Sequence, residues 1–324
     1  MTDVLVVIVS TNDGRWLPAC FDALATSRDA TYDTLLVLND CTDESALAAS
    51  KAPMPIDVVA TPIRCGFAET NNLGIRRALS LGYPYVFLLN PDTKIHPDAL
   101  SHLTRFLDSN ESYGIAGSQQ IRYDAAGWDS PNQWTTETID HARQLGNAPV
   151  RRSNWMVLDH YYVQGAALMM RTNLVTRIGM LDPLYGTFYE ETDLCRRARY
   201  GGHAVALVLD SLVKHYEGGH WRRTRRDHLH RDMLFLRNQY VYFVSEAKTT
   251  PAAVYCGIKV FMRQMHAMLF GEHQLKLALW RYPEVLVQAC LTLRYIPRMR
   301  RRNSTIRARA TLEASEYAIG ASRC

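Results

Sequence analysis

Short apolar runs alternate with segments of helical spacing over the first 120 residues. The apolar runs cover residues 4–10, 34–38, 57–60, 85–89 and 113–117, and the helical segments cover 16–27, 42–49, 70–81 and 97–107. Strands and helices that alternate through short connections predict an α/β fold with a parallel, doubly wound sheet. The strands are continuously apolar, which indicates burial on both faces of the sheet.

The regular alternation ends near residue 120. Residues 121–160 are rich in turn-forming residues and include Trp128, Trp134 and Trp155. We therefore expect a long irregular segment that forms a binding loop or lid, and the alternative is a surface excursion with its own small aromatic cluster. From residue 226 onwards, long helical patterns replace the strands.

The last part of the chain is basic as well as helical. Residues 276–309 contain nine Lys and Arg residues against one acid, Glu284, with apolar residues interleaved. This pattern is typical of helices that dock on an anionic membrane surface. It fits equally well a helical cap that packs on the catalytic domain and exposes a solvated basic face, and the sequence leaves both interpretations open.

Length and composition indicate a globular protein. The 324 residues are 47% hydrophobic and 21% charged, enough for a sizeable core, and a net charge of +5 is too small to imply a nucleic-acid partner. Seven scattered cysteines without a Cys-x-x-Cys pair favour a reducing, cytoplasmic compartment over a disulfide framework or a zinc site. No apolar run approaches the roughly 20 residues that span a bilayer, and the first strand is too short for a signal peptide. We expect a soluble or peripheral protein.

Polar residues follow the first two predicted strands. Ser10 and Asn12 end the first strand, and Asn39 and Asp40 end the second. Polar groups at the carboxyl edge of a sheet can hold a nucleotide base or ribose. They can equally form the turn and the cap of the following helix, and the sequence leaves both interpretations open.

A glycine-containing stretch precedes the third predicted helix. Gly66 permits a close backbone approach before Phe67, and Asn71 and Asn72 are expected to open a helix whose N-terminal amides favour anionic groups. Arg64 is placed to pair with a phosphate.

Asn90-Pro91-Asp92 follows the apolar run at 85–89 and is the most informative motif of the chain. Asp92 is a short, hard oxygen ligand of the kind that Mg²⁺ or Mn²⁺ prefers, so we expect it to bind such a metal at a diphosphate. The alternative is a turn that starts the next helix. His215 follows a later apolar run and is a second candidate ligand for a metal or a phosphate.

An acidic stretch at residues 190–193 supplies candidate general bases. Adjacent carboxylates such as Glu190 and Glu191 raise one another's pKa towards the working range of a base. Asp193 and Arg197 are four residues apart on the following helix and can pair. The alternative is an acidic first turn that complements the helix dipole.

In this order the motifs resemble those of the family 2 glycosyltransferases with a GT-A fold, particularly the branch with bacterial rhamnosyltransferases. The matching stretches are 39–43, 66–74, 90–93, 189–197 and His215, and the resemblance covers roughly residues 3–220. It implies a Rossmann-like mixed sheet over residues 1–225, with a nucleotide-sugar half to about 120, an acceptor half over 121–225, and a C-terminal helical extension over 226–324.

The resemblance also implies roles for individual residues. Asp92 matches the family's metal ligand, His215 a second ligand, and Glu191 the catalytic base, with Glu190 as its rival. Three positions depart from the pattern. Leu38 replaces an acid that holds the nucleoside and leaves Asp40 as a substitute, Arg64 replaces an asparagine, and Glu191 replaces an aspartate.

The implied activity is an inverting transfer of a sugar from a nucleoside diphosphate sugar, dTDP-rhamnose or a UDP-sugar, to a hydroxyl of a glycan or lipid-linked acceptor. Two other classes remain. A sugar nucleotidyltransferase would need a Gly-rich phosphate loop near the first strand, which residues 10–16 lack. An inactive scaffold would explain the basic tail and the altered positions without any turnover.

Overall fold

The computed structural model describes residues 2–128, 148–159, 162–216, 225–270 and 280–321, and for 225–228 and 314–321 it describes the backbone alone. The strands are β1 Val4–Ser10, β2 Tyr32–Asn39, β3 Asp57–Thr61, β4 Tyr85–Leu89, β5 Thr93–Ile95, β6 Tyr113–Arg122, β7 Val150–Arg152, β8 Trp155–Asp159, β9 Ala167–Arg171 and β10 Ala204–His215. The helices are α1 Leu17–Ala25, α2 Ser45–Ser50, α3 Phe67–Leu81, α4 Ala99–Ser109, α6 Thr172–Ile178, α7 Glu190–Tyr200, α8 Arg225–Glu246, α9 Thr250–Phe270, α10 Tyr282–Leu293 and α11 Ile296–Ala321.

The strands form one mixed sheet in the order β3-β2-β1-β4-β9-β6-β10-β8-β7, and β5 pairs with β10. Strands β3, β2, β1 and β4 are parallel, as the alternating pattern predicts, whereas β9 runs antiparallel to both β4 and β6. The sheet is therefore mixed rather than wholly parallel, in agreement with the GT-A architecture that the motifs imply.

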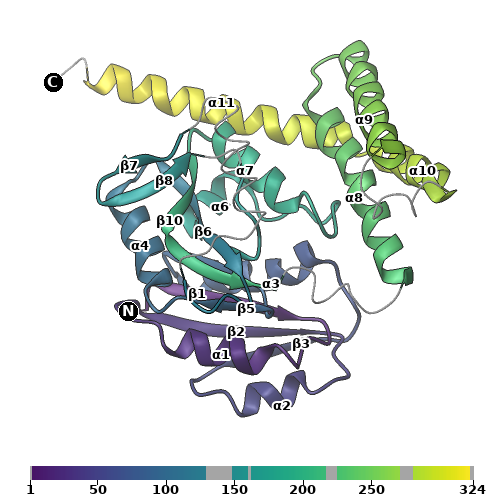
Figure 1. The fold of residues 1–324 in the computed structure, drawn as a ribbon. Coiled ribbons are helices and arrows are strands. Elements are labelled where there is room, and N and C mark those ends of the chain that lie inside the picture. Colours follow the sequence, from purple (N-terminus) through teal and green to yellow (C-terminus); the bar gives the residue numbers. More distant parts are fainter. Residues whose placement is uncertain (1, 129–147, 160–161, 217–224, 271–279, 322–324) are drawn as a thin grey trace.

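Helices cover both faces of the sheet (Figure 1). Val4, Val6 and Ile8 of β1 point towards α1 and α4, and the alternate residues Leu5 and Val7 point towards α3, α6 and α7. Because successive side chains of a strand point to opposite faces, a strand between two helical layers must be apolar at every position. This burial explains the continuous apolar runs.

The sequence expectation for residues 121–160 needs correction. The segment 121–160 is not irregular throughout, because β6 extends to Arg122 and residues 150–159 form the antiparallel pair β7–β8. These strands continue the sheet through β8–β10 pairing, a long-range contact that local composition does not reveal. Trp134 lies outside the described residues.

Long helices follow β10, as the sequence predicts. Figure 1 shows α8, α9 and α10 grouped beside the sheet layers and α11 running back across them. Ile306 of α11 joins the core formed by α3, α6 and α7, so the last helix packs on the sheet-bearing part. The division at residue 225 stays a prediction. In the described part of the chain, no helix is long and apolar enough to cross a membrane.

Close packing of α3 on β1 requires glycine at position 74. A Cβ there would lie 2.4 Å from both Cγ methyls of Val7. We expect Gly74→Ala to lower the free energy of unfolding by about 1–3 kcal/mol through overpacking, measured by urea denaturation. Val7→Ala in the same chain should restore much of the loss.

Gly257→Ala is the matched control, because a Cβ at this position in α9 meets nothing within 4 Å. There the helix propensity of alanine should leave stability unchanged or raise it by about 0.5–1 kcal/mol. Equal effects at Gly74 and Gly257 would show that contact with Val7 is unimportant.

Candidate functional site

The polar loops after β1, β2 and β4 gather at one edge of the sheet, because these strands are parallel. Asn39 joins two of them: its Nδ2 donates to Thr11 Oγ1 at 3.0 Å and to the Cys65 carbonyl at 2.9 Å. Its Oδ1 accepts from the Cys65 amide at 2.8 Å and from Thr61 Oγ1 at 3.2 Å. Asn39 thus fixes the loop before Gly66, and its contact with a nucleotide stays a prediction.

Ser10 and Asn12 also hold loops together. Asn12, at φ 62°, accepts hydrogen bonds from the Thr42 and Asp43 amides at 2.7 and 3.1 Å. The buried Ser10 hydroxyl lies 2.8 Å from Ser45 Oγ. The contacts of Ser10 and Asn12 are therefore those of the second interpretation, in which these residues form the turns and caps before the helices. Asp40, in contrast, is exposed at the end of β2, with φ 53°.

The loop before α3 makes the close backbone approach that its glycine suggested. A Cβ on Gly66 would lie 2.9 Å from the Cα of Gly186, and the Ala68 amide donates to the Gly186 carbonyl at 3.0 Å. The approaching group is thus protein backbone from the loop before α7. The exposed Arg64 precedes this contact.

The expectation that Asn71 and Asn72 open a helix is wrong, because α3 begins at Phe67. Glu69 accepts a hydrogen bond from the Gly66 amide at 3.1 Å and caps the helix one turn earlier. Asn71 donates to the Phe67 carbonyl at 2.9 Å, and Asn72 bonds both the carbonyl and the amide of Leu181, at 2.8 and 3.1 Å.

The structure brings Asp92 and His215 together. Strand β5 pairs antiparallel with β10, with Thr93 opposite His215 in the register. This pairing places Asp92 beside the histidine, and His215 Nε2 lies 3.3 Å from Asp92 Oδ1 with both side chains 8% exposed. Two residues 123 positions apart therefore form one small polar site.

Gln120 of β6 determines how His215 presents its ring. Gln120 Oε1 lies 2.9 Å from His215 Nδ1. An amide oxygen only accepts, so Nδ1 donates to it, and Nε2 is the ring nitrogen that faces the Asp92 carboxylate. An imidazole nitrogen and a carboxylate oxygen that face each other in a buried site are atoms of the kind that bind a divalent cation.

A cation held there would need further ligands. Among the residues that the structure describes, no group of three or more His, Cys, Asp and Glu side chains could hold a metal ion. Mg²⁺ commonly takes one or two protein ligands and completes its shell with water and substrate phosphates. Asp92 and His215 suit such a partial site, which a diphosphate would complete.

Glu191 reaches the same edge of the sheet from α7. A Cβ built on Gly165 would lie 3.2 Å from Phe67 Cζ and 3.9 Å from Glu191 Cβ, so these three residues are neighbours. The next residue, Ala166, accepts a hydrogen bond from the Asn90 amide at 2.9 Å. The loop that carries Gly165 thus lies between the candidate base and the Asn-Pro-Asp motif.

The environment of the two glutamates is suited to proton transfer. Burial raises the pKa of the half-buried Glu191 to about 7. Glu190 is 3% exposed, and burial together with the charge of Glu191 raises its pKa well above the ordinary value. Glu190 therefore holds its proton more firmly than a free carboxyl, and Glu191 titrates in the range that a general base requires.

The turn before α7 has an unusual backbone. Phe188 and Tyr189 both have positive φ, 71° and 72°, in the left-handed region that bulky residues avoid. Asn238 of α8 holds this turn, because its Nδ2 lies 2.8–2.9 Å from the carbonyls of Tyr185, Thr187 and Phe188. The strained conformation that delivers Glu190 and Glu191 thus depends on a helix from the C-terminal part.

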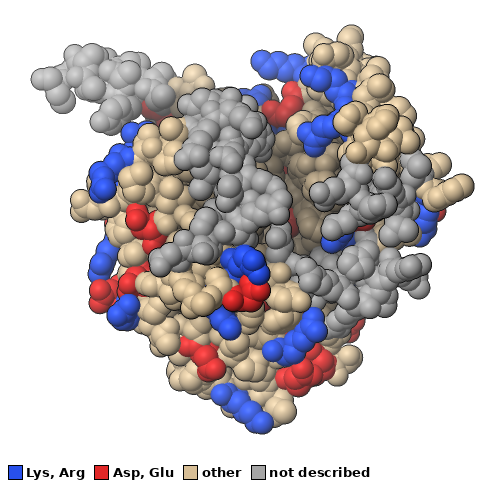
Figure 2. Space-filling view, in the orientation of Figure 1, with Lys and Arg blue, Asp and Glu red and all other residues tan. Residues whose placement is uncertain are grey.

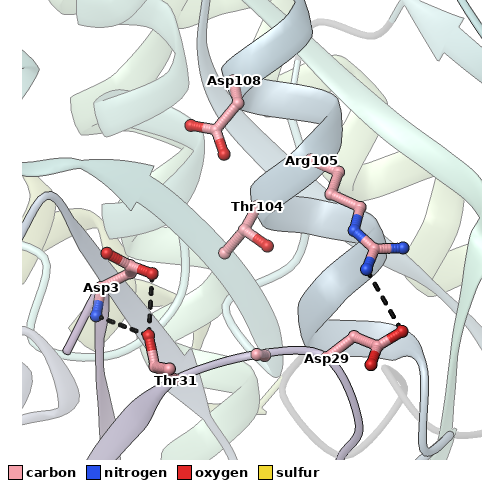
Figure 3. Close-up of a pocket in the computed structure, with 7 residues that line it drawn as sticks. Asp3, Asp29, Thr31, Thr104, Arg105 and Asp108 are labelled. Atoms are coloured by element: carbon pink, nitrogen blue, oxygen red, sulfur yellow. Dashed lines mark hydrogen bonds and ion pairs between the residues drawn. The ribbon is translucent and has the colours of Figure 1, made fainter. Parts of the chain in front are cut away.

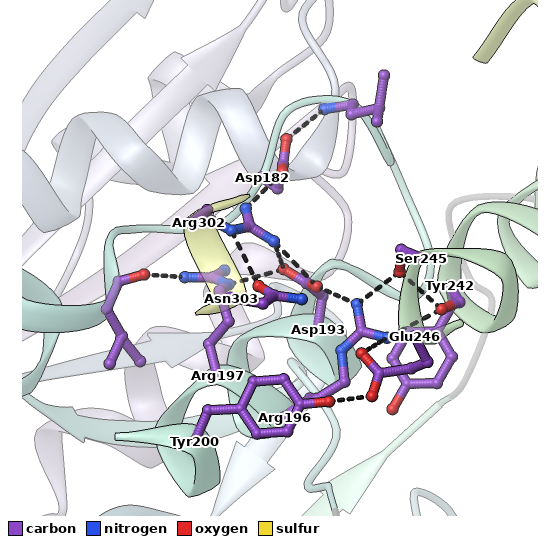
Figure 4. Close-up of polar contacts among 12 residues, drawn as sticks. Asp182, Asp193, Arg196, Arg197, Tyr200, Tyr242, Ser245, Glu246, Arg302 and Asn303 are labelled. Carbon is purple, nitrogen blue, oxygen red and sulfur yellow. Dashed lines mark hydrogen bonds and ion pairs between the residues drawn. The ribbon is translucent and has the colours of Figure 1, made fainter. Parts of the chain in front are cut away.

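Asp193 anchors α7 one turn after the strained residues (Figure 4). Its fully buried carboxylate pairs with Arg196 at 2.6 Å, with Arg197 at 2.7 Å and with Arg302 of α11 at 3.0 Å. The predicted pairing of Asp193 with Arg197 is confirmed. Burial alone would raise the pKa of Asp193, but the guanidinium charges of Arg197, Arg196 and Arg302 outweigh it and hold the pKa well below its usual range.

A cavity at the opposite edge of the sheet is unrelated to this site. It lies at the amino ends of β1 and β2, where Asp3 bonds Thr31, and α4 contributes Arg105, which pairs with Asp29 (Figure 3). The candidate metal ligands and glutamates are at the carboxyl edge, and they do not line this cavity.

Residues 2–232 match a family model described as "Glycosyltransferase like family 2". The chain belongs to glycosyltransferase family 2. This family 2 chain is 28% identical over 138 residues to the low-salt glycan biosynthesis hexosyltransferase Agl10 of Haloferax volcanii. The match covers 41% of the chain and 43% of that protein, less than half of each.

Solved structures share the fold. The mannosyltransferase PcManGT from Pyrobaculum calidifontis, in complex with GDP-Man and Mn²⁺, has a TM-score of 0.57 at 12% identity over 96% of this chain and 87% of its own. S. aureus TarS 1-349 in complex with UDP has a TM-score of 0.54 at 14% identity, over 95% and 90%. The GT-A fold implied by the motifs is confirmed for this family 2 protein.

Sequence reasoning missed several residues that build the site. Gln120, Gly165, Gly186, Asn238 and Arg302 act through contacts between distant elements. Gln120 had a weak signal, since it is a polar residue within an apolar strand. The others lie in loops or basic helices, where the sequence shows no pattern that points to family 2 chemistry.

The support of the strained turn can be tested with Asn238→Ala. Loss of the amide leaves three carbonyls without this donor, so we expect about 1–3 kcal/mol less stability. Sugar transfer should lose about tenfold or more in kcat while the donor KM stays within about threefold, because Glu191 is displaced and donor contacts are retained.

Asn110→Ala is the control, because Asn110 is a half-buried amide whose Nδ2 donates to the Phe106 carbonyl at 2.8 Å at the end of α4, away from the turn. It should lower the unfolding midpoint without changing kcat below that midpoint. Equal kcat losses in both variants would show that general stability, and not the turn, governs activity.

Proposed function

We propose that this protein is an inverting glycosyltransferase that moves a sugar from a nucleoside diphosphate sugar to an acceptor hydroxyl, in the assembly of a cell-surface polysaccharide or glycoconjugate. The observation that carries this proposal is that groups suited to two different tasks lie at the same edge of the sheet. The Asp92–His215 pair suits the diphosphate, and Glu191, with a pKa raised to about 7 by burial, suits the acceptor.

In the proposed reaction Glu191 takes the proton of the acceptor hydroxyl. The acceptor oxygen bonds the anomeric carbon from the face opposite the diphosphate, and the bond from that carbon to the phosphate oxygen breaks with both electrons on the oxygen. A positioned base typically contributes about 10²–10⁴-fold. Mg²⁺ or Mn²⁺ held by Asp92 and His215 would neutralise charge on the leaving diphosphate.

The identity of the donor is a second part of this proposal. PcManGT binds GDP-Man, TarS binds UDP, and Agl10 is named a hexosyltransferase. We retain dTDP-rhamnose or a UDP-sugar as the proposed donor, with a rhamnosyltransferase-like specificity. Its base and ribose would lie near Asn39 and the exposed Asp40, with Asn12, Arg64 and Phe67 around the phosphates and sugar.

An inactive scaffold is the second candidate. Leu38 stands where the resemblance implies an acid, and the Ser10 and Asn12 side chains bond protein groups. A scaffold would bind partners without turnover of any nucleotide sugar. A sugar nucleotidyltransferase is disfavoured, because residues 10–16 form a short turn into α1 without a Gly-rich loop.

Diphosphate release from a panel of nucleoside diphosphate sugars, with Mg²⁺, Mn²⁺ or EDTA, tests the class directly. We expect release from one donor in the presence of a glycan or lipid-linked acceptor, and its loss with EDTA or Asp92→Ala. Asp98→Ala is the control, because Asp98 is a partly exposed carboxylate that pairs with Arg28 on the surface. No release and no thermal shift with any nucleotide would favour the scaffold.

The base assignment predicts both a rate and a pH dependence. The rate should rise as pH increases through about 7, because only the ionised Glu191 accepts a proton. Glu191→Gln should lower kcat by about 10²–10⁴-fold with donor binding intact. A loss below about tenfold would reject this role, and Glu190→Gln tests the rival carboxylate.

Stability should change in the opposite sense. The folded protein keeps the Glu191 proton to higher pH than the unfolded chain, so burial of this group costs stability as pH rises from 4.5 to about 7. Glu191→Gln should therefore flatten the fall in unfolding free energy over this interval, measured by urea denaturation at a series of pH values.

A further inference from the structure

Helix α9 has an exposed apolar face in addition to its buried one. Val254, Ile258, Phe261, Met262 and Leu269 are between 36% and 60% exposed, and we call them the α9 stripe. At 100° per residue they fall within an arc of about 100°. Val260, Gln264 and Met268 fill the next arc and are buried against neighbouring helices.

A contiguous apolar stripe of this kind differs from scattered exposed residues, which are normal on protein surfaces. On α10, which packs against α9 through Ala289 and Val260, Val287 and Leu291 are also more than half exposed and lie one turn apart. Figure 1 shows both helices standing away from the sheet. Among the described residues, Tyr282 of α10 partly covers Phe261, with ring centroids 5.9 Å apart, and the other four residues of the stripe are more than half exposed.

The charge on α9 itself is of one sign. Lys259 lies about 60° beyond the edge of the stripe, Arg263 lies about 100° beyond it, and α9 contains no Asp or Glu. On α10 the single acid, Glu284, pairs with Arg281. Figure 2 shows several Lys and Arg side chains near the top of the molecule, in the region of α8 and α9, with an acidic group beside them.

We infer that the α9 stripe docks on an anionic lipid bilayer. Apolar side chains with basic residues on their flank are the chemistry of a helix that lies in the lipid headgroup region. A second copy of this chain fits less well, because a two-fold contact through the stripe would bring Lys259 of the two copies towards each other without an acid on α9 to pair with either. This places the docking surface on α9, outside the basic segment 276–309 that the sequence alone indicated.

Helix α9 also links this surface to the candidate active site. Arg263 lies over the Phe243 ring at 5.5 Å and beside the Tyr189 hydroxyl, whose pKa burial raises to about 12. Tyr189 is the residue before α7 and its glutamates. A bilayer under the stripe would hold a lipid-anchored acceptor near Glu191. The docking surface itself is independent of the transfer reaction, and only this benefit rests on the proposed function.

Co-sedimentation of the full chain with vesicles tests the docking surface. Wild type should sediment with phosphatidylcholine vesicles that contain phosphatidylglycerol, bind phosphatidylcholine alone more weakly, and be released as salt rises to about 0.5 M. The double variant Ile258→Glu with Met262→Glu should lose about tenfold or more in vesicle affinity, because two carboxylates replace apolar contacts in the headgroup region.

Leu47→Glu with Leu81→Glu is the matched control, because it changes the charge equally at residues 54% and 58% exposed on α2 and α3. This control should bind vesicles as wild type does. Equal binding by the two double variants, or no preference of wild type for anionic vesicles, would overturn the proposal. It would also be overturned if light scattering showed an oligomer that only the α9 variant dissociates, without vesicle binding.

Turnover separates this proposal from the transferase proposal. With a water-soluble acceptor the α9 double variant should release diphosphate at the wild-type rate, because its changes do not touch the Asp92–His215 pair or Glu191. If the protein binds vesicles but turns over no nucleotide sugar, the docking proposal is supported and the transferase proposal is rejected.

Discussion

The candidate site depends most on the ion pairs that the buried carboxylate of Asp193 forms. A carboxylate without solvent contact is costly unless it is paired and hydrogen-bonded, and here three arginines surround it. Arg197 also bonds the carbonyls of Ile178, Gly179 and Met180, which fixes the loop before α7. Removal of either side of this network would leave uncompensated charge in the core, so α7 has one position relative to the sheet.

That network ties the C-terminal helices to the chemistry. Arg302 of α11 bonds both Asp193 and Asp182, and Arg196 bonds the Tyr242 carbonyl and Ser245 of α8. Together with Asn238 at the strained turn, these contacts make α8 and α11 part of the support for the candidate base. The two regions expected from the sequence are therefore energetically coupled, because the C-terminal helices help to hold α7 in place.

At the carboxyl edge of the sheet, most polar side chains hold the loops themselves. Asn39, Asn72 and Asn12 bond backbone groups of neighbouring loops, which fixes their positions before any ligand binds. In the proposed reaction, a preorganised edge of this kind would let Asp92, His215 and Glu191 act without reorganisation. The docking surface on α9 would fix how the protein lies on a membrane. This orientation would further constrain where the acceptor enters.

The sequence by itself determined the elements and the motifs. Residues buried on both faces of a sheet must be apolar throughout, so β1, β2 and β4 were visible as continuous runs, and the acids at their ends and at α7 were visible as motifs. The hairpin β7–β8 was missed because its place in the sheet depends on pairing with the distant β10. The start of α3 was misplaced because Gly66 stands where a capping box usually has Ser or Thr, so the cap from Glu69 was not recognised. Only tertiary structure decided that Gln120 orients His215, that Asn238 holds the turn before Glu190, and that Arg302 reaches Asp193. Each of these contacts joins residues that are far apart in the chain. They are stabilised because charged and amide groups buried in the core must be paired, and no single segment of the chain contains that core.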